Sequence, residues 1–395
     1  MAADELKETI AKGEEGSGLS QAGVKCNTML HEKSLPLEPS TLTTTMSTLP
    51  ELPLSPGVGA RRKGPKSLPR LPASAFSPPN TGTSEQFPLA PSPSTLYPEK
   101  VIDAQVSESI DVWTADASKT LEDKAEGIVI SLVGKIPEEV TAAVDSIRSK
   151  PPTPPVLAVL VPFSLEDGIP TNPPVYLSSL PPSPSTPSSP SAPRIVLAAT
   201  YTRFSVPAVE ALKWAVEQGH SVDLSIQTNL RAGEGAWEDL EELLSKAIPE
   251  KHQGKVILSN ILPPPDDLTL PIVKLLTHPT YNDYQSQIAT LSLYANVSVK
   301  FLPPAWPLGG EGNVDKKEWK RRIKMYVGPA LEAFGYERII FGSSPASSSH
   351  PRALSSSEWF ELARECFAEL GTEQEDLDVV FSGNARKVYA AVPSS

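Results

Sequence analysis

The chain has 395 residues, a formal net charge of −12 and 6% aromatic residues, and its 43 prolines are about twice the usual share. This composition excludes a collagen, a disulfide scaffold (the chain has two cysteines) and a basic nucleic-acid-binding protein. The longest apolar runs fall far short of the roughly 20 residues that a membrane helix needs. The N-terminal stretch has no apolar segment typical of a secretory signal, so we expect a cytoplasmic protein with no membrane association.

The prolines gather in two segments, with 14 in residues 1–99 and 14 in residues 150–193. Residues 1–98 are rich in Ser, Thr and Pro and cannot bury enough apolar surface to offset the entropy of ordering, which predicts a disordered tail. Residues 170–193 interrupt the remainder of the chain and predict a surface loop of polyproline character. Either Pro-rich segment could bind a protein partner, and residues 170–193 could instead be a simple insertion.

From residue 99 to residue 392 the pattern changes to short apolar, β-branched runs that alternate with helical stretches. Continuous apolar runs are typical of strands that are buried on both faces, as in parallel sheets. Eight such runs predict strands at 101–106, 127–133, 156–161, 194–199, 222–226, 255–258, 297–301 and 338–342.

Helical patterns fill most of the intervals between the predicted strands. They predict helices at 137–148, 206–218, 236–248, 281–294, 316–334 and 357–370. Eight strands alternating with helices over this length predict a single (β/α)8 TIM barrel. The alternative is an open doubly wound sheet, but no G-x-G-x-x-G motif follows any predicted strand, which removes the main support for a dinucleotide fold.

Functional groups of such barrels lie at the C-terminal ends of the strands and in the loops that follow them. That position predicts a site formed by polar residues after the first, fourth, fifth, sixth, seventh and eighth strands. The candidate ligand-binding residues are Gln105, Ser107, Arg203, Gln227, Asn260, Lys300 and Ser344, with His350 as a further candidate for proton transfer.

The residues around these strand ends resemble the amidohydrolase-related barrel hydrolases, especially their lactonase-like branch. The stretch 338–345, RIIFGSSP, is similar to a family strand that ends in F-G-S-D-W-P, and FSGNARKVY at 381–389 is similar to its F-x-x-N-A-x-x-x-Y phrase. Further similarities, in the family's order, are VIDAQVS at 101–107, GHSVDL at 219–224, VILSN at 256–260 and ANVSVK at 295–300. The resemblance implies a TIM barrel and hydrolase activity.

The departures from the family pattern fall on its metal ligands. The resemblance places those ligands at a His-x-His pair, two further histidines and an aspartate. The corresponding positions here are all neutral, namely Gln105, Ser107, Gln227, Asn260 and Ser344. Amide and hydroxyl oxygens alone offset the dehydration of a divalent ion poorly. We therefore expect no bound metal and no cofactor, and no activated water at this site.

Three hypotheses for the function follow from these observations. The first is a barrel without metal-dependent catalysis that binds a small polar or anionic ligand or serves as a scaffold. The second is a divergent, metal-independent hydrolase of a lactone or ester, in which Arg203 or Lys300 stabilises an oxyanion and His350 handles protons. The third is an interaction protein that works through its Pro-rich segments.

Overall fold

The computed structural model describes residues 92–107, 109–117, 119–171, 193–231, 235–249, 254–306, 315–346 and 353–390. The predicted disordered tail therefore lies outside the described residues up to residue 91, and so does nearly all of the predicted Pro-rich loop. None of the helices in the described residues is both long and apolar enough to span a membrane.

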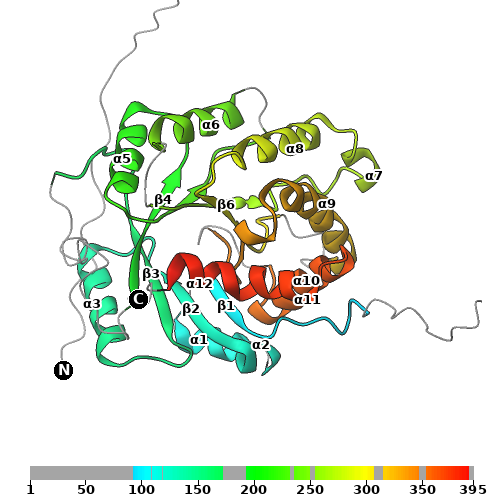
Figure 1. Cartoon of the computed structure of the whole chain (residues 1–395), viewed down its shortest axis with the longest axis horizontal. Coiled ribbons are helices and arrows are strands. Elements are labelled where there is room, and N and C mark those ends of the chain that lie inside the picture. The colour runs from blue at the N-terminus through cyan, green and yellow to red at the C-terminus, as the bar shows by residue number, and fades with distance from the viewer. Residues whose placement is uncertain are drawn as a thin grey trace, which may run out of the picture. The chain divides into compact units, whose positions relative to one another are not determined.

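Eight parallel strands form one sheet in the order of the chain, and this confirms the predicted (β/α)8 barrel (Figure 1). All eight predicted strands are present. Each is an apolar run rich in β-branched residues, which is typical of a strand that is buried on both faces of a parallel sheet. The strands are β1 (Val101–Val106), β2 (Ala125–Ser131), β3 (Val156–Pro162), β4 (Arg194–Tyr201), β5 (Val222–Ile226), β6 (Val256–Leu262), β7 (Val297–Phe301) and β8 (Ile339–Phe341).

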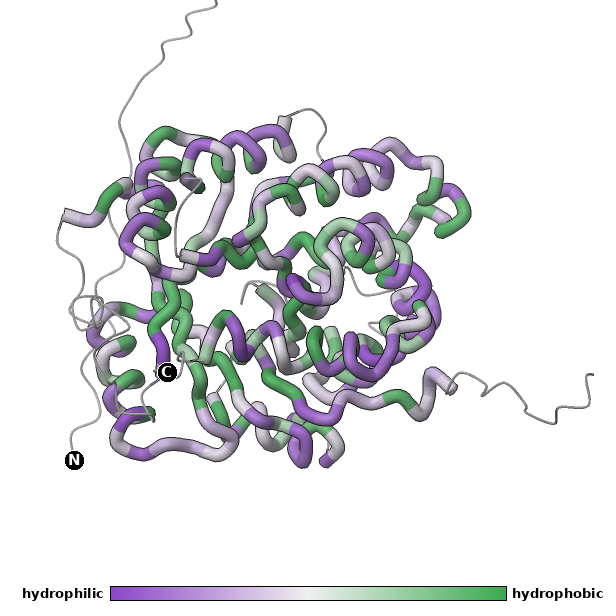
Figure 2. The backbone as a smooth tube through the Cα atoms, in the orientation of Figure 1, coloured by the Kyte–Doolittle hydropathy of each residue, from purple (hydrophilic) through white to green (hydrophobic). Residues whose placement is uncertain are grey.

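Helices surround these strands and present one apolar face to them, so the helical segments carry both colours in Figure 2. The six predicted helices agree with the structure to within about three residues at either end. They are α3 (Pro137–Ser149), α5 (Val206–Glu217), α6 (Ala236–Ala247), α8 (Pro279–Leu291), α9 (Lys316–Phe334) and α10 (Ser356–Glu369). The shorter helices were not predicted from the sequence: α1 (Ile110–Asp116), α2 (Lys119–Lys124), α7 (Ile272–Leu275), α11 (Gln374–Asp378) and α12 (Asn384–Tyr389).

The seam between β1 and β8 is closed by hydrogen bonds just beyond the strand ends. The backbone N–H of Ser344 donates to the carbonyl of Gln105 at 2.9 Å. Gly342 permits this approach, because an added Cβ would lie 2.8 Å from the Cβ of Gln105. The two ends of the sheet are thereby joined into a barrel.

The helix α12 closes the N-terminal end of the barrel. Ala385, Val388 and Tyr389 pack against interior side chains of the strands and form one buried cluster with them. The side chains of Arg194 and Lys255 donate to the carbonyls of Val388 and Lys387, each at 2.9 Å, where cations suit the end of a helix. Because this end is sealed, any ligand would enter from the C-terminal end.

Residues 92–98 pack onto the outside of the barrel along α10. Leu96 is buried in the main apolar cluster, and its carbonyl and that of Pro93 accept hydrogen bonds from Arg364. The Arg364 guanidinium also lies 3.8 Å from the centroid of the Tyr97 ring. This segment is therefore part of the packed domain.

Candidate functional site

A cavity of about 370 Å³ lies at the C-terminal ends of the strands. Its size is within the usual range of small-molecule sites, about 300–1,000 Å³. Its polar lining comes from β1, β2, β4, β5 and β6 and from the loops that follow them. These residues are Gln105, Ser107, Ser131, Thr200, Thr202, Asp223, Ser225, Gln227 and Ser259.

Lys300 lies directly behind this lining and is fully buried. Its ammonium forms an ion pair with Asp223 and donates a hydrogen bond of 2.7 Å to Oε1 of Gln105. It also lies 5.4 Å from the centroid of the Tyr389 ring. Burial lowers the pKa of Lys300, and Asp223 opposes that shift by favouring the charged form. Lys300 is thus an internal cation with three partners.

Asp223 is the anion of this cluster, and sequence reasoning did not identify it as a site residue. Its Oδ1 accepts a 2.7 Å hydrogen bond from the hydroxyl of Ser259, and its Oδ2 accepts one of 3.4 Å from Tyr389. Burial raises the pKa of Tyr389 well above its ordinary value, and the neighbouring Asp223 adds to the shift, so the phenol stays protonated as a donor. The signal in the sequence was a carboxylate inside a strand that is predicted to be buried on both faces.

A second buried carboxylate, Asp103, holds the seam of the barrel without a cationic partner in its hydrogen bonds. It accepts from the backbone N–H groups of Gln105 and Ser343, at 3.1 Å and 2.8 Å, and from Nε1 of Trp113 at 2.8 Å. The Ser343 hydroxyl donates to it as well. Burial raises the pKa of Asp103, although these donors act in the opposite direction. Asp103 therefore fixes the strand ends next to the cavity.

The structure brings four of the candidate residues together at the cavity. Gln105, Ser107 and Gln227 line it, and Lys300 lies behind it and contacts Gln105. Nε2 of Gln227 donates to the hydroxyl of its neighbour Ser225 at 2.9 Å.

The other candidates lie elsewhere or form structural hydrogen bonds. Asn260 has a left-handed backbone (φ 68°), and its amide donates to the carbonyl of Ile226 at 2.7 Å. The hydroxyl of Ser344 accepts from the backbone N–H of Ser107 at 3.3 Å, across the seam. Arg203 is exposed beside a neighbouring hollow. His350 lies outside the described residues.

The residues at the family's metal positions do not suit a divalent ion. All five are neutral, and Oε1 of Gln105 accepts from an ammonium, which already supplies a positive charge at this point. Within the described ranges, no three His, Cys, Asp or Glu side chains are grouped so that they could hold a metal ion.

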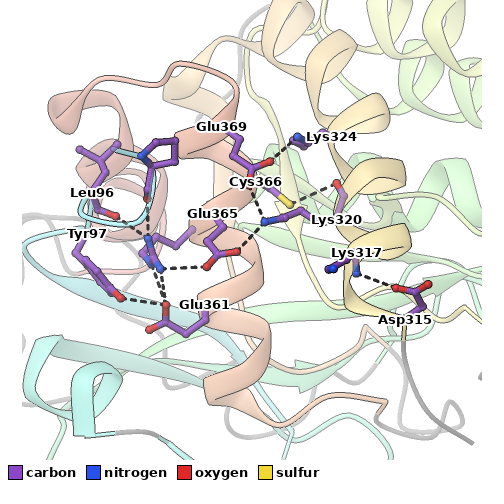
Figure 3. Close-up of polar contacts among 12 residues, drawn as sticks. Leu96, Tyr97, Asp315, Lys317, Lys320, Lys324, Glu361, Glu365, Cys366 and Glu369 are labelled. Atoms are coloured by element: carbon purple, nitrogen blue, oxygen red, sulfur yellow. Dashed lines mark hydrogen bonds and ion pairs between the residues drawn. The ribbon is translucent and has the colours of Figure 1, made fainter. Parts of the chain in front are cut away.

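A larger hollow, of about 500 Å³, lies outside the barrel between α9 and α10. It borders a lattice of surface ion pairs between lysines of α9 and glutamates of α10, in which Lys320 contacts both Glu365 and Glu369 (Figure 3). These charges are mutually paired and partly open to solvent, as is typical of a surface that joins two helices. The cavity at the strand ends is therefore the candidate ligand site.

Among known proteins, only solved structures are similar to this chain. No family model matches the chain, and no curated protein matches it. An amidohydrolase from Burkholderia multivorans, solved with bound zinc, is 11% identical, with a TM-score of 0.48 over 73% of this chain and 98% of the other.

Two further solved structures are similar over a comparable length. A putative 2-pyrone-4,6-dicarboxylic acid hydrolase from Pseudomonas putida is 15% identical, with a TM-score of 0.48 over 74% of this chain and 98% of the other. A 2,6-dihydroxybenzoate decarboxylase from Rhizobium is 11% identical, with a TM-score of 0.35 over 73% and 98% of the two chains. At these identities the likeness is one of fold. The sheet of eight parallel strands makes the chain a TIM barrel, and the solved structures to which it is similar include amidohydrolases.

Proposed function

We propose that this barrel binds a small polar molecule in the cavity at its C-terminal end and does so without a divalent metal. It would act as a ligand-binding or scaffold protein rather than as a metal-dependent hydrolase. The observation that carries the proposal is the contact between Lys300 Nζ and Oε1 of Gln105, at one of the positions where the family resemblance expects a metal ligand. A metal ion there would meet an ammonium in a site of low dielectric, where like charges repel strongly.

Lys300 also offers little support for the alternative of a metal-independent hydrolase. An oxyanion needs donors that are aimed at it and not already satisfied. Lys300 is enclosed by Asp223, Gln105 and Tyr389, and Arg203 lies beside a different hollow. Interaction through the Pro-rich segments stays a separate prediction, because those segments lie outside the described residues.

The test is elemental analysis of the full chain, purified from medium that is supplemented with zinc and manganese, together with thermal unfolding with and without each metal. We expect less than about 0.1 metal ion per chain and no shift of Tm, since a ligand bound only by the native state raises Tm. One zinc or manganese per chain, lost in Gln105→Ala, would contradict the proposal. The matched control is Gln374→Ala, a glutamine on α11, far along the chain from the strand ends.

A further inference from the structure

The uncharged groups of the cavity indicate the class of its ligand, an inference that rests on the proposed ligand-binding function. Within the described part of the chain, the hydroxyls of Ser107, Ser131 and Thr200 line the cavity without a hydrogen-bond partner. Nε2 of Gln105 and Oε1 of Gln227 are unpaired in the same way, since each side chain is engaged only through its other amide atom. The cavity thus offers groups that both donate and accept.

The formal charges at the cavity cancel. Asp223 is the charged side chain among the described lining residues, and its carboxylate is paired with Lys300 behind it. An anionic ligand would find no unpaired cation in that lining, and burying an uncompensated charge is costly. A cationic ligand would have to compete with Lys300 for Asp223.

Part of the lining is apolar and faces the same space. Leu160 on β3, Ala198 and Ala199 on β4, and Val133 in the loop after β2 contribute small aliphatic surfaces. A ligand that carries both C–H surface and hydroxyls would bury its C–H surface against these residues and exchange hydrogen bonds with Ser131, Thr200 and Gln227.

We propose that the ligand is a neutral polyhydroxylated molecule of about monosaccharide size, such as a polyol. A hydroxyl group both donates and accepts, so it can satisfy Gln105 Nε2 and Gln227 Oε1 with the same chemistry. The pairing of Asp223 with Lys300 makes the cavity selective for uncharged ligands over carboxylates of the same size.

The experiment compares matched pairs of compounds by ligand-observed NMR titration of the full chain. The pairs are sorbitol with gluconate, and glucose with glucuronate, which differ by exchange of a CH2OH group for a carboxylate. At least one neutral member should bind ten times or more tightly than its anionic partner. Ser131→Ala and Thr200→Val should each weaken that binding by about threefold to tenfold, the effect of one hydrogen bond.

Thr141→Val, on the outer helix α3, is the matched control and should leave binding unchanged. Tighter binding of gluconate or glucuronate, still sensitive to Ser131→Ala, would overturn the ligand class and leave the proposed site in place. Binding that is insensitive to Ser131→Ala and Thr200→Val would overturn this site, and the absence of binding by all four compounds would overturn the proposed ligand class. If either variant fails to fold, Gln227→Leu takes its place. Metal bound at the site, measured separately as above, would overturn the proposed function itself.

Discussion

Two clusters in this molecule pair lysine with a carboxylate, one inside the barrel and one on its outer surface, and they differ in how far they are exposed to solvent. Inside the barrel, Lys300 and Asp223 are 0% and 4% exposed, and each has further hydrogen-bond partners. Between α9 and α10, Lys320 and Glu369 are 24% and 28% exposed and belong to a lattice open to solvent (Figure 3). The inner pair is therefore shielded from water and salt, whereas water and salt can replace much of what the outer pair contributes.

The largest effect is expected from breaking the inner pair. Lys300→Met leaves the carboxylate of Asp223 buried without a cation, and we expect the free energy of unfolding to fall by about 3–5 kcal/mol. Urea denaturation measures this change. Adding Asp223→Asn to Lys300→Met should recover a substantial part of the loss, because the uncompensated charge is then gone. Equal stability of Lys300→Met and the unmodified chain would show that the ion pair does not form.

Arg364 is a buried cation that differs from Lys300 and Lys320, because it donates hydrogen bonds to two backbone carbonyls. Arg364→Met removes the donors to Pro93 and Leu96, and we expect a loss of about 2–3 kcal/mol. Hydrogen exchange at residues 92–98 should then become faster while exchange in β1 to β8 changes little. The matched control is Arg386→Met, whose side chain is half exposed on α12. Unchanged exchange at residues 92–98 would contradict the packing of this segment.

Asp103 shows what a buried carboxylate does when its hydrogen-bond donors are neutral. Asp103→Asn replaces one acceptor oxygen by a donor facing Trp113 and Ser343, and we expect a loss of about 1–2 kcal/mol. The folded-state pKa of Asp103 is raised, so its contribution is complete below the pKa of the unfolded chain and declines as pH rises through the folded value. The cost of Asp103→Asn should accordingly be larger at pH 3 than at pH 7.

Urea unfolding of the two proteins across that pH range measures the difference. A cost of Asp103→Asn that grows as pH rises would contradict the direction of the shift. Ser343→Ala, which removes one neutral donor, is the companion variant and should leave most of the pH dependence in place.

The smallest effect is expected in the outer lattice. Lys320→Met should lower the free energy of unfolding by less than about 1 kcal/mol, and the loss should shrink further at 1 M salt. The same salt should barely change the effect of Lys300→Met. Comparing the two variants in low and high salt therefore measures the difference between the clusters directly. A salt response of equal size in both would contradict the stated burial of Lys300.

The barrel could be predicted from the sequence because its signals are local. Each strand is a β-branched apolar run such as Val156–Pro162, and most of the long helices have an apolar face and recognisable ends, such as the capping box that begins at Ser355. The helix α12 was missed because six residues give too short a period to recognise. Its role as the seal of the barrel depends on tertiary packing.

The site was predictable only in part. Gln105, Ser107, Gln227 and Lys300 were chosen as candidates because they follow or end predicted strands, where barrels place functional groups. The structure places them at or directly behind one cavity. The partner of Lys300 could not be assigned, since Asp223 lies 77 positions earlier in the chain and becomes a neighbour only when the barrel closes. Asn260 and Ser344 carry an amide and a hydroxyl, as ligand-binding residues often do, but their side chains form hydrogen bonds with backbone groups. The spacing of residues in the sequence does not reveal these partners.

We propose that the Lys300 ammonium, and not a metal ion, supplies the positive charge at the C-terminal end of the barrel. A crystal structure of the full chain grown in millimolar zinc, with anomalous data at the zinc edge, tests it most directly. We expect no anomalous peak within 4 Å of Gln105, which is about the outer limit of an ion pair, and Lys300 in contact with Asp223. A zinc peak bound by Gln105 or Asp223, with Lys300 displaced, would contradict the account.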